Sequence, residues 1–327
     1  MLTYISRRLL MMIPTLVAIS ILVFTLIQLP PGDAITSRLA DLQAEGSEVS
    51  EEEIAALRAR FNLDDPVHIQ YLRWVGGFVR GDMGYSIVHE QRVNDLVRDR
   101  LGYTVLVALA CLLFTWVIGF PIGFYSAIKQ YSTSDYVFTL VAFLGMATPN
   151  FLLALILMYF GHVYFGLTVG GLISPEYMGE PFTFAKVVDL LKHIWIPMVV
   201  VGTAGTAGLV RIMRANLLDE LQKPYVVTAR AKGVPPYQLI FKYPVRIAIN
   251  PFISTVGWML PMIFSGDAIV GVVLNLPTIG PLLLESLMTQ DMFLAGSIIM
   301  VMSLLTVLGT LISDLLLAAV DPRIRYE

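Results

Sequence analysis

The chain has 327 residues, of which 56% are hydrophobic and only 14% are charged, and its mean hydropathy is +0.73. Soluble domains carry about a quarter charged residues, so this composition argues against a water-soluble fold. The net charge of -3 and the absence of a face rich in Lys and Arg exclude a nucleic-acid-binding protein.

The first predicted element is an apolar stretch from Leu9 to Leu29 that follows Arg7 and Arg8. A helix needs about 20 apolar residues to cross a hydrocarbon core roughly 30 Å thick, and this stretch has that length. A cleavable signal peptide is the alternative, but the stretch is longer than a usual signal core and ends without a small-residue cleavage site. We therefore expect residues 1–29 to form a retained N-terminal transmembrane helix.

Residues 30–102 form the one sizeable hydrophilic insert. Ser50 and Glu53 make a capping box at the start of one predicted helix. A second helix is predicted to begin with Asp65 as its N-cap and Pro66 at its first position. Its apolar face and its end are supplied by Tyr71, Trp74, Phe78 and Gly81. These signals predict a small helical cap.

Further along the chain, other apolar stretches nearly free of charge are long enough to cross a bilayer. They are Tyr103–Ile128, Tyr136–Phe165, Ile194–Met213, Pro251–Leu274 and Phe293–Val320. Residues 103–327 are therefore predicted to form a core with five transmembrane helices, so that the whole chain crosses the membrane about six times. Pro149 should break the helix of the Tyr136–Phe165 stretch. The backbone groups that the break frees would either line a water-filled path or be satisfied by packing against neighbouring helices.

In the short loops near the ends of these stretches, Lys and Arg are concentrated in alternate connections. They precede the first stretch, follow the second, crowd the connection after the fourth and follow the sixth, whereas the connection after the fifth has none. Positively charged loops are retained in the cytoplasm. Both termini are therefore predicted to be cytoplasmic and the insert extracytoplasmic.

Asp267 and Asp314 are the ionisable residues deepest within apolar stretches. A charged side chain at mid-bilayer costs about 2.5 to 3.5 kcal/mol, so both should face protein or water. We expect Asp314 to be structural and His162 to lie at the membrane interface. Small residues recur at Gly202, Gly205 and Gly208, which predicts a close helix contact.

The connection at residues 215–250 is too polar to enter lipid and too long for a simple turn. A helix is predicted to end at Gly233, and Pro235-Pro236 should force a bend before a second short helix. Two interpretations remain open at this point. Small side chains such as Ala229 would let a partner approach while Arg230 and Lys232 pair with its acidic groups, or a basic surface helix would touch anionic lipid headgroups.

The sequence YVVTARAKG at residues 225–233, followed by RIAINP at 246–251, resembles the EAA loop of binding-protein-dependent ABC importers, in particular their dipeptide and oligopeptide permeases. Further matches cover nearly the whole chain. They are Leu63-Asp64-Asp65-Pro66, Gly81-Asp82-Met83-Gly84-Tyr85-Ser86, Thr148-Pro149-Asn150-Phe151 and Asp321-Pro322-Arg323. Val227-Thr228 stands where the pattern has Glu-Ala, a departure that is usual in the peptide branch.

The resemblance implies an all-α membrane protein with a type I importer permease (MetI-like) core and the extracytoplasmic helical insert between its first two spans. It also implies a coupling helix that sits in a groove of an ATPase. The residues expected to make this contact are Tyr225, Thr228, Ala229, Arg230, Ala231, Lys232 and Gly233. The residues expected to line the translocation path are Thr148, Pro149, Asn150, Ser265 and Asp267.

The implied partners are a second homologous permease, two ATP-binding-cassette ATPase subunits and an extracytoplasmic solute-binding protein, in the lipid of a bacterial or archaeal cytoplasmic (inner) membrane. The chain has no G-x-x-x-x-G-K-[ST] phosphate loop to cradle a nucleotide. We therefore expect a transport subunit that is not an enzyme and has no cofactor of its own, with ATP and Mg bound by the partner ATPases.

The implied substrates are oligopeptides or dipeptides delivered by the solute-binding protein. Where peptide permeases commonly read Val-Glu-Thr-Val-Phe, this chain reads VGVVL at 270–274, so an acidic position is empty. The alternative is the same importer class carrying oligosaccharides or another small solute. A stand-alone secondary transporter is less favoured because no internal repeat is evident. An intramembrane enzyme is less favoured because no nucleophile motif is evident.

Overall fold

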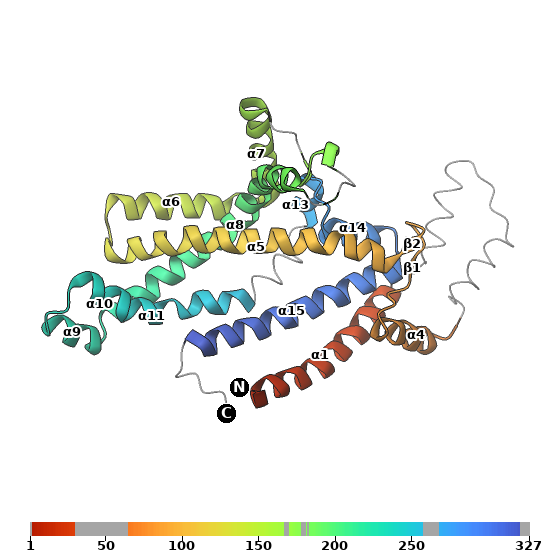
Figure 1. Cartoon of the computed structure of the whole chain (residues 1–327), viewed down its shortest axis with the longest axis horizontal. Helices are drawn as coiled ribbons and strands as arrows, with labels where there is room; N and C mark the ends of the chain where they lie inside the picture. Colours follow the sequence, from red (N-terminus) through yellow and green to blue (C-terminus); the bar gives the residue numbers. More distant parts are fainter. Residues whose placement is uncertain are drawn as a thin grey trace. The chain divides into compact units, whose positions relative to one another are not determined.

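The computed structural model describes residues 2–29, 65–166, 170–177, 181, 183–257 and 268–320. Within these ranges the chain is mostly helical, and the elements are labelled in Figure 1. It divides into two compact units, which are described separately. The first comprises Met1–Thr104 and Thr278–Val307, and the second comprises Val105–Pro277 and Leu308–Glu327.

Among the described residues, four helices are long and apolar enough to cross a membrane. They are α1 (Leu2–Gln28), α5 (Val93–Ile128), α8 (Phe184–Leu221) and α15 (Met292–Val320). The helices α6 (Thr133–Ala147) and α7 (Asn150–Phe165) pass the same test as a bent pair. The remaining predicted span lies partly outside the described residues, with helix at 250–257 and α13 (Ala268–Val273) on either side of the gap.

The long helices extend beyond the predicted apolar stretches. α5 begins at Val93, ahead of the predicted start at Tyr103, and therefore runs without a break through the predicted boundary between insert and core. α8 begins at Phe184, where the hydroxyl of Thr183 accepts a hydrogen bond from the Lys186 amide. Hydropathy locates the part of a helix that lipid surrounds, whereas caps and packing decide where the helix ends.

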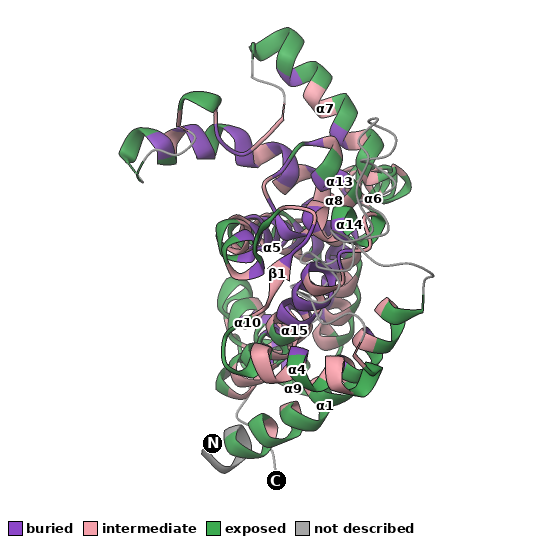
Figure 2. Cartoon of the chain, turned by 90° about the vertical axis from the view of Figure 1, so that its right-hand side faces the viewer, coloured by how far each residue is buried: buried purple, intermediate pink, exposed green. Residues whose placement is uncertain are grey.

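Large apolar side chains cover the outside of several helices. Leu10 and Leu22 on α1 are 66% and 61% exposed, and Tyr164 and Phe165 at the end of α7 are exposed too. Figure 2 shows both helices as mainly exposed. Such faces exceed what a soluble monomer presents to water, so they fit a lipid environment or contact with other subunits.

In the first unit, α4 (Val67–Val79) packs against α1. The predicted apolar face is confirmed, because Trp74 is buried beside Val23 and Met300. The hydroxyl groups of Ser20 and Tyr71 lie 2.9 Å apart and share a hydrogen bond. The predicted end of α4 is also confirmed. Gly81 follows the helix with φ +83°, and the Asp82 amide bonds to the Gly77 carbonyl. This arrangement is a Schellman motif.

The predicted start of α4 is wrong by one residue. Pro66 occupies the N-cap position instead of the first helical position, and no side chain caps the helix. The Asp65 carboxylate accepts a hydrogen bond from the Arg73 guanidinium instead of an amide of the first turn. A charge-assisted pair with Arg thus replaces the cap. The first predicted helix, with Ser50 and Glu53, lies outside the described residues.

A small hairpin of β1 (Tyr85–Ser86) and β2 (Gln91–Arg92) precedes α5 and is absent from the sequence predictions. It is held to the start of α15 by the buried Asp291, whose carboxylate accepts a hydrogen bond from the Ser86 hydroxyl at 2.5 Å. The same carboxylate accepts the Leu294 amide at 3.2 Å and so caps α15. α14 (Ile279–Met288) completes this unit.

In the second unit, glycines let α8 approach its neighbours closely. A Cβ added at Gly202 would lie 2.5 Å from the Phe114 ring of α5, so the predicted close contact is confirmed at that position. A Cβ added at Gly208 would meet nothing within 4 Å, so the prediction is wrong there. Gly123 of α5 supplies a contact that the sequence analysis missed, because its Cβ would lie 2.7 Å from Met213.

Candidate coupling hairpin and helix break

Residues 222–250 contain the predicted helix-turn-helix. It consists of α9 (Pro224–Ala231) and α10 (Pro236–Lys242), and a further turn of helix, α11 (Pro244–Ala248), follows. Each of the three begins with a proline at its first position, where the missing N–H has no intrahelical partner to lose. We call α9 and α10 with the turn between them the coupling hairpin.

The coupling hairpin has a small apolar core of its own. Val226, Ala229 and Leu239 are buried in it, and Val234 packs against them. α9 ends in a Schellman motif, in which the Gly233 amide bonds to the Arg230 carbonyl at 3.0 Å and the Val234 amide bonds to the Ala229 carbonyl at 3.3 Å. Gly233 has φ +77°, a conformation that favours glycine.

The predicted contact residues divide into two groups on this hairpin. Ala229 is only 7% exposed and faces Leu239, so its small side chain admits α10. The other predicted contact residues are exposed: Tyr225, Thr228, Arg230, Ala231, Lys232 and Gly233. The outer surface of α9 therefore presents two cations and several small side chains.

The coupling hairpin is joined directly to the long helix α8. Only Gln222 and Lys223 separate the end of α8 from the start of α9, and their amides bond to the Asp219 and Glu220 carbonyls. The Tyr225 hydroxyl donates a hydrogen bond to the Glu220 carboxylate, which ties the two helices together again. The connection between α8 and α9 is therefore short and held by hydrogen bonds.

The predicted break at Pro149 is confirmed. α6 and α7 are bent by 105° where Thr148 and Pro149 interrupt the helix. Thr148 has the extended backbone that a following proline favours, and its hydroxyl donates to the Leu144 carbonyl at 2.8 Å. Asn150 begins α7. Figure 1 shows α7 leaving at one end of α6, while the coupling hairpin lies beyond the other end.

The remaining predicted path residues, Ser265 and Asp267, lie outside the described residues. Of the other ionisable residues singled out above, Asp314 is half-buried on α15 and His162 is exposed in the last turn of α7.

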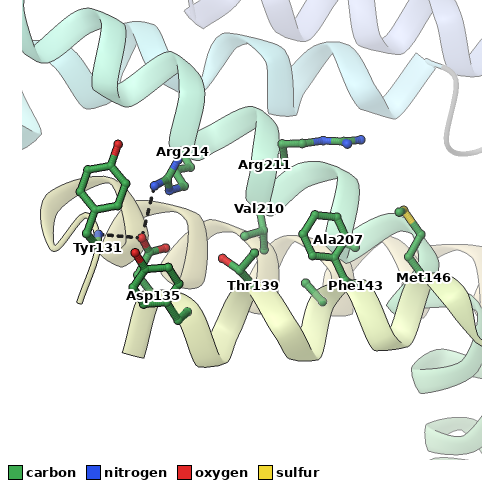
Figure 3. A pocket seen from close by; sticks show the side chains of 11 residues that line it. Tyr131, Asp135, Thr139, Phe143, Met146, Ala207, Val210, Arg211 and Arg214 are labelled. Atoms are coloured by element: carbon green, nitrogen blue, oxygen red, sulfur yellow. Dashed lines mark hydrogen bonds and ion pairs between the residues drawn. The ribbon is translucent and has the colours of Figure 1, made fainter. Parts of the chain in front are cut away.

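An ion pair between α6 and α8 is absent from the predictions. The Arg214 guanidinium lies 3.2 Å from the Asp135 carboxylate, whose side chain is only 4% exposed and also accepts the Tyr131 amide at 3.0 Å. Ser132 caps α6 through the Asp135 amide. The spacing of Ser132 and Asp135 is a helix-start signal that could have located this end of α6. A cavity adjoins the pair (Figure 3).

Comparison with known proteins agrees with this architecture. The family described as "Binding-protein-dependent transport system inner membrane component" matches residues 119–326, and the N-terminal family of the same membrane components matches residues 1–108. The oligopeptide transport system permease protein AppB of Bacillus subtilis is 36% identical over the full length of both chains. The di/tripeptide transport system permease protein DppB of Pseudomonas aeruginosa is 30% identical, again over the full length of both.

A solved structure supports the same fold. The chain matched in an inward-facing crystal form of the MetNI methionine ABC transporter has a TM-score of 0.55 and 15% identity, over 69% of this chain and 96% of that chain. The all-α, type I permease core predicted from the sequence is therefore confirmed. The protein is a multi-pass inner-membrane transport subunit and not an enzyme. The chain belongs to the family of binding-protein-dependent transport system inner membrane components, the permease subunits of ATP-binding-cassette importers.

Proposed function

We propose that this chain carries peptides across the inner membrane as one of two homologous permease subunits that together enclose the translocation path. Relatives over its full length are named for oligopeptide, di/tripeptide and glutathione transport, and all three are peptides. Peptides then arrive from an extracytoplasmic solute-binding protein and leave into the cytoplasm. ATP and Mg are held by the ATPase subunits, because this chain has no phosphate loop.

The observation that carries the mechanism is the coupling hairpin. Its apolar core holds α9 in place, and its outer face carries Arg230 and Lys232. Gln222 and Lys223 join it to α8 along the chain, and the Tyr225–Glu220 hydrogen bond joins it again. An acidic groove on an ATPase would pair with those cations. Closure of the two ATPases would then move α9, and α8 would follow because the link has little slack. This role puts the hairpin and both termini on the cytoplasmic side.

The break between α6 and α7 is the candidate for the substrate path. Irregular backbone at membrane depth is tolerated where it faces protein or a water-filled cavity. Thr148 and Asn150 would offer polar groups to a peptide backbone there, and Ser265 and Asp267 stay as the other residues predicted to line the path. This assignment rests on the helix geometry at Pro149 and on the polarity of the residues beside it.

Transport by the assembled importer tests the substrate class. The tagged chain is purified in mild detergent with the subunits that accompany it, placed in proteoliposomes and supplied with its solute-binding protein, ATP and a labelled tripeptide. We expect ATP-dependent uptake that unlabelled peptides inhibit and maltotriose does not. Uptake of the oligosaccharide alone would replace the peptide assignment, and ion-driven flux by the lone chain would overturn the importer itself.

Labelling of Lys232 tests the orientation. A membrane-impermeant amine reagent should modify Lys232 in inside-out vesicles and leave it unmodified in intact cells. The variant Arg230→Gln changes the neighbouring charge but keeps the lysine, so it should show the same labelling pattern. Modification from the outer side of intact cells would reverse the topology and would remove the coupling role.

A further inference from the structure

The cavity between α6 and α8 is not part of the proposed transport mechanism. Its volume is about 270 Å³, and its walls are almost entirely apolar apart from the end that carries the Asp135 and Arg214 ion pair. Sites for drug-sized ligands measure about 300–1,000 Å³, so this cavity is too small for a peptide substrate. It suits a single narrow hydrocarbon chain.

The cavity is open on one side to whatever surrounds the helices. Tyr136, Phe143 and Met146 on α6 line it, and these side chains are 61%, 50% and 48% exposed. Ala207 and Val210 on α8 form the opposite, buried wall (Figure 3). An apolar groove of this kind between two membrane-spanning helices is filled by protein or by lipid, because water gains no hydrogen bonds there.

The charges along the cavity leave one cation in excess. Arg214 is neutralised by Asp135, but Arg211 has no hydrogen-bond or ionic partner in the part of the chain that the structure describes. Arg211 is exposed. It lies three residues before Arg214 on α8, which corresponds to about 4.5 Å along the helix axis. Figure 3 shows its side chain extending away from the ion pair, above the apolar wall.

We propose that this cavity is a binding site for an acidic phospholipid, with one acyl chain in the groove and the phosphate against Arg211. One unbalanced guanidinium beside an apolar slot matches one anionic headgroup above a hydrocarbon chain. Basic pockets between membrane helices hold acidic headgroups in this way. A bound lipid would bridge α6 and α8 beside the ion pair and would support the helix that carries the coupling hairpin.

Lipid retention tests the proposal. The full chain, purified with its partner subunits and washed free of lipid in mild detergent, is titrated with dioleoyl phosphatidylglycerol or dioleoyl phosphatidylcholine and measured by native mass spectrometry. We expect one tightly held phosphatidylglycerol, and Arg211→Gln should weaken its binding about fivefold because one cation near an anionic lipid contributes about 1 kcal/mol. Lys129→Gln is the matched control: it removes an exposed cation near the start of α6 that does not line the cavity, and it should change nothing.

A second variant separates the groove from the charge. Ala142→Trp fills the cavity from α6 and leaves Arg211 intact, so it should also release the lipid. Thermal unfolding in detergent identifies a variant that has lost its fold. An independent experiment places a photoreactive side chain at position 142 and identifies what it cross-links to in native membranes. An adduct with phospholipid supports the proposal, whereas an adduct with a second polypeptide overturns it. Three further results would each overturn the proposal. They are equal retention of phosphatidylcholine, displacement of the lipid by millimolar inorganic phosphate, and unchanged lipid binding by the Arg211→Gln variant.

Discussion

Gly233 shows how a single residue fixes the end of the coupling hairpin. Its φ of +77° allows the amides of Gly233 and Val234 to bond back to α9, and no Cβ contact within 4 Å restricts the position. The cost of replacing it therefore comes from the backbone alone. A residue with a Cβ pays about 1–2 kcal/mol in this conformation.

Replacement of Gly233 by alanine should loosen the coupling hairpin and lower ATP-dependent uptake, while the transmembrane helices stay folded. The matched control is Gly208→Ala on α8, where an added Cβ also meets nothing within 4 Å but the backbone is helical. Uptake in proteoliposomes and thermal unfolding would be measured for both. Equal uptake by the two variants would contradict a role for the Gly233 backbone.

Ala229 and Arg230 are adjacent but should fail in different ways. Ala229→Leu places extra volume in the buried core with Val226 and Leu239, and overpacking of this kind costs about 1–3 kcal/mol. Arg230→Glu changes only the exposed face. We therefore expect Ala229→Leu to lower the unfolding temperature and Arg230→Glu to reduce the recovery of ATPase subunits without that change. The opposite pattern would mean that Ala229 faces the partner.

Asp291 should be a strong determinant of stability in the first unit. Its buried carboxylate accepts hydrogen bonds from the Ser86 hydroxyl and the Leu294 amide, and each bond to a charged group contributes about 1.5–3 kcal/mol. Asp291→Ala should thus destabilise the protein by at least about 2 kcal/mol, measured by denaturation in detergent. Glu285→Ala, an exposed carboxylate on α14, is the comparison and should have little effect.

At the scale of elements, predictions succeeded where one strong local signal decides the backbone. Pro149 cannot donate a hydrogen bond and restricts Thr148, so the break in the helix is readable from sequence. The hairpin of Tyr85–Ser86 and Gln91–Arg92 was missed because strands of two residues have no periodicity to detect. The Arg214 and Asp135 pair was missed because its members are far apart in the chain and meet only after α6 packs on α8.

The angle at Pro149 can be measured. Spin labels at the exposed residues Leu140 and Tyr159 would be about 28 Å apart on a straight helix. Since α6 and α7 are bent by 105°, we expect a much shorter distance. The one native thiol, Cys111, is buried and would be replaced by serine for the measurement. Pro149→Ala should shift the distribution towards longer distances, and a wild-type distance near the straight-helix value would contradict the bend.

At the scale of the whole molecule, the sequence identified the family and predicted the helix-turn-helix of the coupling hairpin, but it could not identify how the hairpin is linked to the core. Hydropathy ends the fourth span at Met213, whereas α8 continues to Leu221 and places the hairpin directly at its end. The polar surface of that extension hides it from a hydropathy profile. The mechanical continuity from α9 through Gln222 and Lys223 into α8 is a property of the folded chain only.

Lengthening that link should separate ATP hydrolysis from transport. Insertion of Gly-Gly between Gln222 and Lys223 leaves the buried core of the coupling hairpin intact, so the ATPases should still bind and hydrolyse ATP. The slack would absorb the displacement before it reaches α8, and peptide uptake should fall at least tenfold at an unchanged ATPase rate. The same insertion after Pro181, in the connection that leads into α8 from its other end, is the control and should leave the ratio of uptake to hydrolysis unaltered. If uptake fell only in proportion to hydrolysis, or if both insertions behaved alike, motion would not be reaching the membrane helices through this junction.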